Sequence, residues 1–153
     1  MGTFYTDCLV ANHIHQNRTA HISKLLVDTG SENTWIAGST LKHIGVLPEK
    51  KDVNFVMASG RMVSREIGFA VIRIGEYFTI DEVVFAHEGD LQVLGARTLE
   101  GLNLVIDPRR KTLVAAGPLP AAVLIEPRRQ AVEVYPAAKE SRAARNSAES
   151  CCV

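Results

Sequence analysis

The sequence is poor in cysteine, in net charge and in long apolar runs. Its three cysteines, Cys8, Cys151 and Cys152, have the spacing of neither a disulfide framework nor a metal site, which fits a reducing compartment. Basic and acidic residues both number 17, so bulk charge gives no reason to expect nucleic acid or a membrane surface as a partner. No apolar run approaches the roughly 20 residues that would cross a bilayer. These absences lead us to expect a cytoplasmic protein.

Familiar signatures of catalysis and cofactor binding are also missing. The chain has no Gly-x-Ser-x-Gly elbow, no Gly-x-Gly-x-x-Gly fingerprint, no P-loop and no His-Glu-x-x-His. It therefore lacks the parts of serine hydrolases, of dinucleotide- and nucleotide-binding enzymes and of zincins. His13, His15 and His21 with Cys8 match no standard zinc spacing, and a solvated hairpin explains these histidines better. We predict no metal and no cofactor.

What the sequence does have is the pattern of a mainly β domain. Short apolar or β-branched runs alternate with turn residues through the first 117 residues of the chain. The pattern predicts strands at residues 3–12, 19–27, 34–37, 53–58, 62–74, 77–85, 91–94, 102–106 and 112–115. A polar turn at 12–18 and a Ser-Gly turn at 58–61 predict two hairpins, of which the second is long enough to project.

Helical signals are few, and the composition changes near the C-terminus. We expect short helices at 39–45, with Ser39 as a cap, and at 96–101. The last part of the chain is rich in Pro, Ala, Arg, Glu and Ser, which bury little surface. We therefore predict one domain at residues 1–117 and a largely disordered tail at 118–153.

The segment LLVDTGSE, residues 25–32, delivers a carboxylate from an apolar run into a tight turn. A buried unpaired carboxylate is costly, so Asp28 either reaches solvent or has surroundings built to use it. Gly30 allows a backbone path that a larger residue would obstruct, and the hydroxyls of Thr29 and Ser31 can orient the carboxylate. Two carboxylates that share one proton can serve as base and acid in peptide hydrolysis. A second carboxylate would therefore explain the position of Asp28.

This turn resembles that of a known enzyme family. The stretch VDTGSENTWI is similar to the catalytic loop of the aspartic protease superfamily, and the rest of the domain resembles its small retropepsin-like branch. Val-Leu-Gly-Ala at 93–96 resembles the segment that passes under this loop in the family, and LGARTLEGLNLVIDPRRKTLV resembles the closing segment of single-domain bacterial members. The resemblance covers residues 3–116. It implies a mainly β, retropepsin-like acid protease half-barrel with one short C-terminal helix and a flap hairpin.

The resemblance also implies roles for individual residues. They are catalytic Asp28, an active-site loop of Thr29, Gly30 and Ser31, a substrate-binding flap of Ala58, Ser59 and Gly60, and structural support from Leu94, Gly95 and Arg97. In viral members of the family, an arginine directly follows the glycine that corresponds to Gly95, and it pairs with an acidic residue of the loop. Here Arg97 comes one residue later, and we expect it to pair with Glu32. Trp35 is expected in the core beside the loop rather than as a substrate contact.

The chain has one Asp-Thr-Gly triplet and no Asp-Ser-Gly, so a single copy cannot supply two such carboxylates. We therefore expect a two-fold symmetric homodimer that hydrolyses peptide or protein substrates by water activated between the two Asp28 carboxylates. No nucleic acid or membrane partner is expected. The alternative is a non-catalytic module on the same scaffold, which would hold an extended peptide by strand addition without cutting it.

Overall fold

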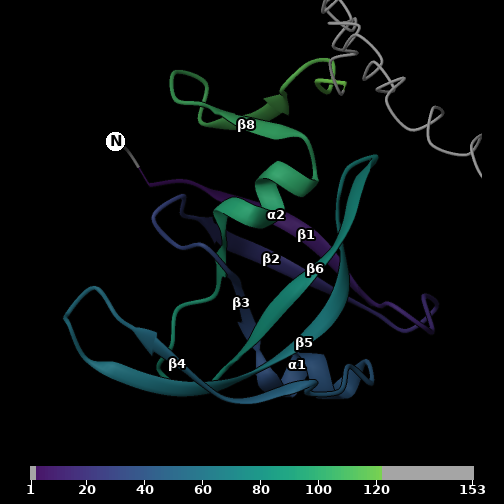
Figure 1. Cartoon of the computed structure of the whole chain (residues 1–153). Coiled ribbons are helices and arrows are strands. Elements are labelled where there is room, and N and C mark those ends of the chain that lie inside the picture. Colours follow the sequence, from purple (N-terminus) through teal and green to yellow (C-terminus); the bar gives the residue numbers. More distant parts are fainter. Residues whose placement is uncertain (1–2, 122–153) are drawn as a thin grey trace, which may run out of the picture. The chain divides into compact units, whose positions relative to one another are not determined.

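The computed structural model of the chain describes residues 3–121, and these residues form a mainly β structure (Figure 1). It consists of a seven-stranded mixed sheet, a separate two-stranded hairpin and two short helices. The strands are β1 Tyr5–Asn12, β2 Thr19–Val27, β3 Thr34–Ala37, β4 Lys50–Val56, β5 Met62–Ile74, β6 Tyr77–Ala86, β7 Val93–Leu94, β8 Leu104–Asp107 and β9 Thr112–Ala115. The helices are α1 Gly38–His43 and α2 Ala96–Gly101. The predicted mainly β class is confirmed, and every strand overlaps a predicted one.

The order of strands in the main sheet is β1-β2-β7-β3-β6-β5-β4. An additional pairing of β1 with β5, residues 9–12 against 70–73, brings the sheet back on itself into a nearly closed ring. Strand β7 pairs parallel with β2 and antiparallel with β3, so it separates two strands that follow one another in the chain. Strand β4 pairs with β5 alone and therefore leaves one backbone edge unpaired within the described sheet.

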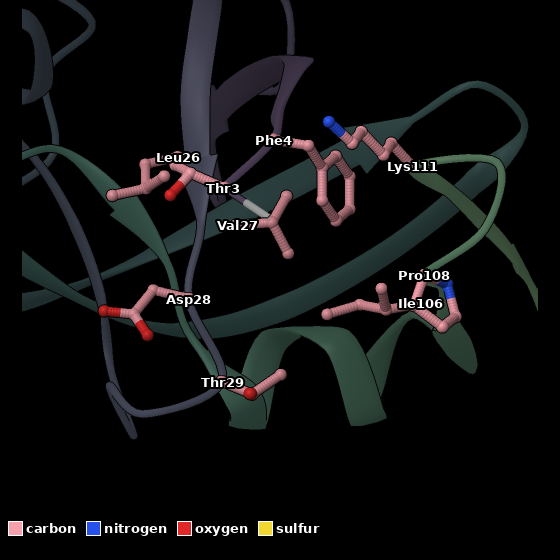
Figure 2. A pocket seen from close by; sticks show the side chains of 9 residues that line it. All are labelled: Thr3, Phe4, Leu26, Val27, Asp28, Thr29, Ile106, Pro108 and Lys111. Atoms are coloured by element: carbon pink, nitrogen blue, oxygen red, sulfur yellow. The ribbon is translucent and has the colours of Figure 1, made fainter. Parts of the chain in front are cut away.

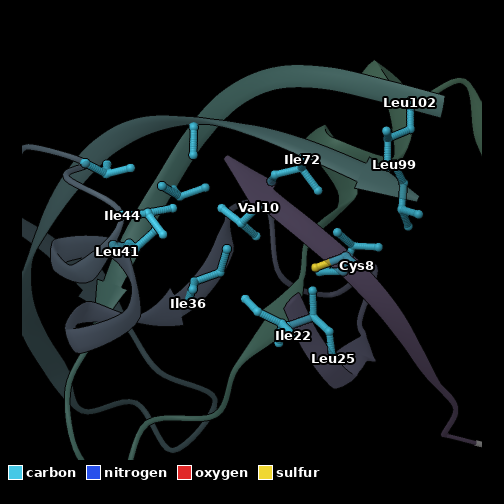
Figure 3. Close-up of a cluster of buried hydrophobic side chains, with 14 of the residues drawn as sticks. Cys8, Val10, Ile22, Leu25, Ile36, Leu41, Ile44, Ile72, Leu99 and Leu102 are labelled. Carbon is cyan, nitrogen blue, oxygen red and sulfur yellow. The ribbon is translucent and has the colours of Figure 1, made fainter. Parts of the chain in front are cut away.

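Buried apolar side chains from strands and both helices fill the space inside the ring (Figure 3). Leu41 of α1 and Leu99 of α2 are 0% and 4% exposed, so each short helix is held by one inward leucine. Cys8 of β1 is also in this cluster, and burial, with a smaller effect from Asp7, raises the pKa of its thiol to about 12. A second cluster, around Trp35 and Val84, lies on the other side of the sheet.

A bulge in β2 decides which way the residues before the Asp-Thr-Gly turn face. Lys24 has a φ of 58°, and its backbone N–H donates to the Asp7 carboxylate over 3.1 Å. The extra residue puts Leu25 and Val27 on the same core face as Ile22, although neither lies an even number of positions from it. Strand alternation then directs Asp28 away from that core. The sequence pattern alone did not predict this bulge.

Several predicted element bounds are wrong, two of them because of a local backbone conformation. Strand β4 begins at Lys50, earlier than predicted, because Asp52 with a φ of 55° forms a bulge that lets pairing continue. Strand β8 begins later than predicted, since Asn103 with a φ of 55° separates it from α2. Helix α1 begins at Gly38 without a side-chain cap, so Ser39 lies inside the helix rather than at its cap.

Asn12, predicted both as the last residue of the first strand and as the first of a polar turn, ends β1 and is only 4% exposed. Its amide donates to the carbonyls of Ile44 and Gly45 over 3.1 and 2.8 Å. Its side-chain oxygen accepts from the backbone N–H groups of Ile14 and His15, both at 2.9 Å. Asn12 therefore ties the β1–β2 turn to the residues after α1, a long-range role that its turn propensity did not indicate.

The compact unit that carries these elements ends at Leu119. The tail predicted at 118–153 falls almost wholly outside the described residues, as do two of the three cysteines. Within the described residues, no helix is long and apolar enough to span a membrane.

Candidate active site

Asp28 lies directly after β2, at the point where the chain leaves the sheet. Its carboxylate oxygen Oδ1 accepts a hydrogen bond from the Gly30 N–H over 2.9 Å, and its carbonyl accepts one from the Ser31 N–H over 3.2 Å. The side chain is half-buried, while Thr29 and Gly30 are exposed. No described residue donates to the second carboxylate oxygen, Oδ2. The turn therefore fixes the carboxylate through one oxygen and leaves the other for a bound group.

Strand β7 supports this turn from beneath. The N–H of Asp28 donates to the Leu94 carbonyl over 3.1 Å, and the N–H of Ala96 donates to the Ser31 carbonyl over 2.8 Å. Leu94 itself is 0% exposed. The segment after β6 thus holds the loop at both of its ends, which limits how far the Asp28 carboxylate can move.

Gly95 is the point of closest approach between the two segments. A β-carbon at this position would lie 2.5 Å from the carbonyl carbon and oxygen of Asn33 and 2.7 Å from the carbonyl oxygen of Glu32. All three are backbone atoms, which cannot rotate aside as a side chain could. The predicted supporting role of Gly95 thus has a steric basis here, because no side chain fits between β7 and the loop.

A buried polar chain braces the same junction, and sequence reasoning missed it. The Thr34 hydroxyl accepts from the Gly95 N–H over 2.9 Å and lies 2.6 Å from the Thr98 hydroxyl. Thr98 in turn donates to the Asp81 carboxylate over 2.8 Å. Both threonines are 0% exposed, so each needs its partners. Their sequence context is ordinary, and no short-range signal marks them.

Arg97 does not form the predicted ion pair with the Glu32 side chain. Only its backbone N–H reaches that residue, donating to the Glu32 carbonyl over 3.2 Å. Its guanidinium lies 3.7 Å from the Asp81 carboxylate and 3.4 Å from that of Glu82. The hydrogen bond from Lys50, and to a smaller degree Arg97, hold the pKa of Glu82 below its ordinary value. The helical turn after Ala96 directs the side chain toward β6, so the prediction is wrong about its partner.

A cleft of about 710 Å³ opens between the Asp28 turn and the β4–β5 hairpin. Residues from the turn, from β3 and β4, and from the loop before β7 line it: Asp28, Gly30, Ser31, Glu32, Asn33, Trp35, Asn54, Phe55, Val56, Met57, Ala58, Gly89, Leu91 and Val93. Trp35, 7% exposed, belongs to a buried cluster as expected and also reaches this cleft. A cleft of this volume has room for part of a bound peptide.

The β4–β5 hairpin forms one wall of the cleft and extends away from the ring (Figure 1). Its turn is closed by hydrogen bonds from the Met57 N–H to Arg61 and from the Gly60 N–H to Met57, both over 2.8 Å. Gly60 has a φ of 81°, which favours glycine. Of the three predicted flap residues, Ala58 lines the cleft, whereas Ser59 and Gly60 lie at the exposed tip of the hairpin.

An ion pair that sequence reasoning also missed joins strand β5 of this hairpin to the loop between β6 and β7. Arg65 donates to both carboxylate oxygens of Asp90, over 2.7 and 2.9 Å, and the His87 N–H donates to the same carboxylate over 2.8 Å. The hydrogen bond from Arg65 is the main reason that the pKa of Asp90 is lowered. This pair anchors the loop whose residues Gly89 and Leu91 line the cleft.

Two further hollows flank Thr29 on the side of the β8–β9 hairpin. One of about 280 Å³ lies between Thr29, the N-terminal segment and the hairpin, and Figure 2 shows Phe4, Ile106 and Pro108 around it. The other, of about 410 Å³, is lined by Thr29 together with residues of α2 and β8. Ile106 and Pro108 line both hollows. The exposed surface around Thr29 is therefore uneven and partly apolar.

No group of three or more His, Cys, Asp or Glu residues within 3–121 is arranged to hold a metal ion. His13 instead lies 3.1 Å from the Phe69 carbonyl through its ring nitrogen Nδ1. Cys8, which the sequence places near these histidines, is buried in the core. The described histidines therefore offer no assembled ligand set.

The structure brings most of the predicted site residues to one place. Asp28, Gly30, Ser31 and Ala58 line one cleft, and Leu94 and Gly95 support the loop beneath it. Thr29 lines the two hollows instead, and the Arg97 side chain points to β6. Comparison with known proteins adds no relative: no protein-family model matches the sequence, and no curated protein matches it. We therefore infer the function of the chain from the geometry and the chemistry of these side chains.

Proposed function

We propose that this chain is an aspartic endopeptidase of the retropepsin-like type, active as a homodimer. The observation that carries the proposal is the Asp28 carboxylate, fixed by Gly30 through one oxygen, supported by β7 and open to a cleft of about 710 Å³. A carboxylate held in this way has a defined direction, and the cleft provides room for a peptide beside it. The intact Asp-Thr-Gly turn supports a working site rather than a decayed one.

The proposed reaction needs two carboxylates, one ionised and one protonated. The ionised group takes a proton from water, the water oxygen attacks the peptide carbonyl, and the protonated group donates to the carbonyl oxygen. Collapse of the intermediate passes a proton to the leaving amine, and no covalent enzyme intermediate forms. Two carboxylates that lie close together cannot both ionise readily, so they share one proton.

The second carboxylate comes from a second copy of the chain in this proposal. Asp28 is followed by the exposed Thr29, and a two-fold axis beside this residue would bring the two turns together. Reciprocal hydrogen bonds between the Thr29 hydroxyls would brace the pair. The hollows that flank Thr29 support an interface on this side of the molecule.

The test is peptide cleavage by purified Asp28→Asn, compared with the unchanged chain. This substitution keeps the shape of the side chain and removes the ionisable group, so the variant should fold and dimerise while cleavage falls at least about a thousandfold. A matched control is Glu76→Gln, which alters an exposed carboxylate in the β5–β6 turn that lines neither the cleft nor the hollows beside Thr29. Cleavage retained by Asp28→Asn would rule out the proposed mechanism.

A second candidate function is a binding module that holds an extended peptide without cutting it. The observation that favours it is the edge position of β4, of which Asn54, Phe55 and Val56 line the cleft. Incubation with an unfolded protein from about pH 3 to about pH 8, with and without a statine-type mimic of the tetrahedral intermediate, separates the two candidates. Cleavage that the mimic blocks supports the peptidase. Binding without cleavage at every pH supports the module.

A further inference from the structure

The cleft beside Asp28 has an uneven distribution of charge. Among its described lining residues, Asp28 and Glu32 carry carboxylates, and none is a lysine, arginine or histidine. The remaining lining side chains are apolar or neutral. An unbalanced negative charge beside an apolar surface favours a ligand that carries both a cationic and an apolar group.

Glu32 is free to serve such a ligand because its expected partner is engaged elsewhere. The Arg97 guanidinium lies toward Asp81 and Glu82, and no cation among the described residues lies within ion-pair distance of the Glu32 carboxylate. The side chain is exposed. At the same time its backbone is fixed, since the Glu32 carbonyl accepts the Arg97 N–H over 3.2 Å. The residue is thus anchored through its main chain while its carboxylate remains available.

The apolar part of the cleft is assembled around an aromatic pair. The rings of Trp35 and Phe55 meet edge to face, with centroids 4.9 Å apart and an interplanar angle of 64°. Val56 and Leu91, 72% and 70% exposed, add apolar surface at the rim. Such a surface gains most from a large apolar side chain that covers it.

We propose that Glu32 is a specificity residue, which selects extended peptides that carry a lysine or arginine close to a large apolar residue. The basic group pairs with the Glu32 carboxylate, and the apolar side chain covers the surface around Trp35 and Phe55. In its cleavage form this inference rests on the proposed peptidase function. Binding of the same peptides does not require cleavage.

The experiment uses pairs of fluorogenic peptides that differ only by lysine or norleucine, placed in turn at each position around a central apolar residue. At one position the ratio of kcat/KM values should favour lysine by about two- to fivefold, as an exposed charge pair allows. Glu32→Gln should bring this ratio close to one, and Glu32→Lys should reverse it. Raising the salt concentration to about 0.5 M should reduce the preference of the unchanged chain, because screening acts on charge pairs.

Glu76→Gln is the matched control, because Glu76 is an exposed glutamate in the β5–β6 turn and does not line the cleft. It should keep the lysine preference of the unchanged chain. The proposal is overturned if no position favours lysine, if Glu32→Gln leaves the ratio unchanged, or if it lowers both kcat/KM values equally.

Binding of the same peptides to the unchanged chain and to Asp28→Asn, followed by fluorescence anisotropy, separates the two proposals. A lysine preference in binding that needs Glu32, with no cleavage, would support this inference and refute the peptidase. Cleavage with no effect of Glu32 would do the reverse. If the chain neither binds nor cleaves these peptides, both proposals are overturned.

Discussion

Gly95 lies directly against the main chain of Asn33, so closely that a β-carbon at position 95 would come within 2.5 Å of the Asn33 carbonyl. The contact joins the segment after β6 to the loop that carries Asp28, two parts of the chain far apart in sequence. Because both sides of the contact are backbone, the approach depends on the missing side chain. The position of Asp28 therefore depends on a residue that takes no part in the chemistry.

The first prediction concerns Gly95→Ala. The added methyl group must push β7 away from the loop, so we expect the free energy of unfolding to fall by about 1 to 3 kcal/mol, as overpacking usually costs. The cleavage rate per folded molecule should also fall, because the displaced loop carries Asp28. Urea denaturation and activity of the folded fraction measure the two effects. In Gly38→Ala the new β-carbon would lie 3.4 Å or more from its neighbours. This control should change stability by less than about 1 kcal/mol.

The second prediction concerns Thr98→Val, which keeps the side-chain shape and removes a buried hydroxyl. Thr34 and Asp81 then each lose a hydrogen-bond partner, at 2.6 and 2.8 Å. We expect the free energy of unfolding to fall by about 1 to 3 kcal/mol, because the remaining polar groups stay buried without that partner.

Thr34→Val and the double variant complete a cycle that tests whether the two threonines act together. Because the hydroxyls are bonded, the double variant should lose less stability than the sum of the single losses. Equal and additive losses, measured by urea denaturation, would show that the two hydroxyls contribute independently.

The parts of the fold that the sequence predicted are those with short-range signals. Alternating apolar residues indicated the strands. The Asp-Thr-Gly turn and the Ser-Gly turn at 58–61 indicated two loops, and both loops contribute residues to the lining of the cleft. These signals hold because strand alternation and turn chemistry depend on neighbours within a few residues.

The features that the sequence did not predict depend on contacts between distant residues. Nothing beside Thr34 shows that its hydroxyl meets Thr98, and nothing beside Asn12 shows that its amide reaches the end of α1. The partner of Arg97 was assigned wrongly, because one residue of shift on a helical turn redirects a side chain by about 100°. The bulge at Lys24 likewise depends on Asp7, which lies on another strand.

The third prediction concerns pH and the pair of Arg65 with Asp90. The hydrogen bond from Arg65 lowers the pKa of Asp90 in the folded chain, so folding favours the ionised carboxylate. This stabilisation is fully present above the unfolded pKa of about 4, and it is lost as the pH falls through the lowered folded pKa. Arg65→Gln should lower the free energy of unfolding by about 2 kcal/mol at neutral pH, with a difference from the unchanged chain that shrinks below about pH 4.

The matched control for this pair is Arg110→Gln. Arg110 lies 3.8 Å from Asp107, but its side chain is 79% exposed, compared with 12% for Arg65. Solvent screens such a pair, so the substitution should cost less than about 0.5 kcal/mol at any pH. Unfolding curves at several pH values test both variants. A loss for Arg65→Gln that stays constant down to strongly acid pH would contradict the assigned cause.

The fourth prediction concerns the surface around Thr29 and tests the proposed dimer. Val105 is a 46% exposed apolar residue of β8 and lines one of the two hollows beside Thr29. If a second copy covers this surface, Val105→Asp buries an unpaired charge at the interface and should weaken dimerisation at least about tenfold. Sedimentation equilibrium measures the dimer dissociation constant directly.

Activity should follow the loss of dimer, because each copy supplies one of the two carboxylates in the proposed mechanism. At concentrations below the dissociation constant, specific activity should fall on dilution, and it should begin to fall at higher concentration for Val105→Asp. Ile14→Asp is the control, since Ile14 is 70% exposed in the β1–β2 turn and lines neither hollow. It should leave the dissociation constant unchanged. Specific activity that stays constant while the chain sediments as a monomer would exclude a carboxylate pair shared between copies.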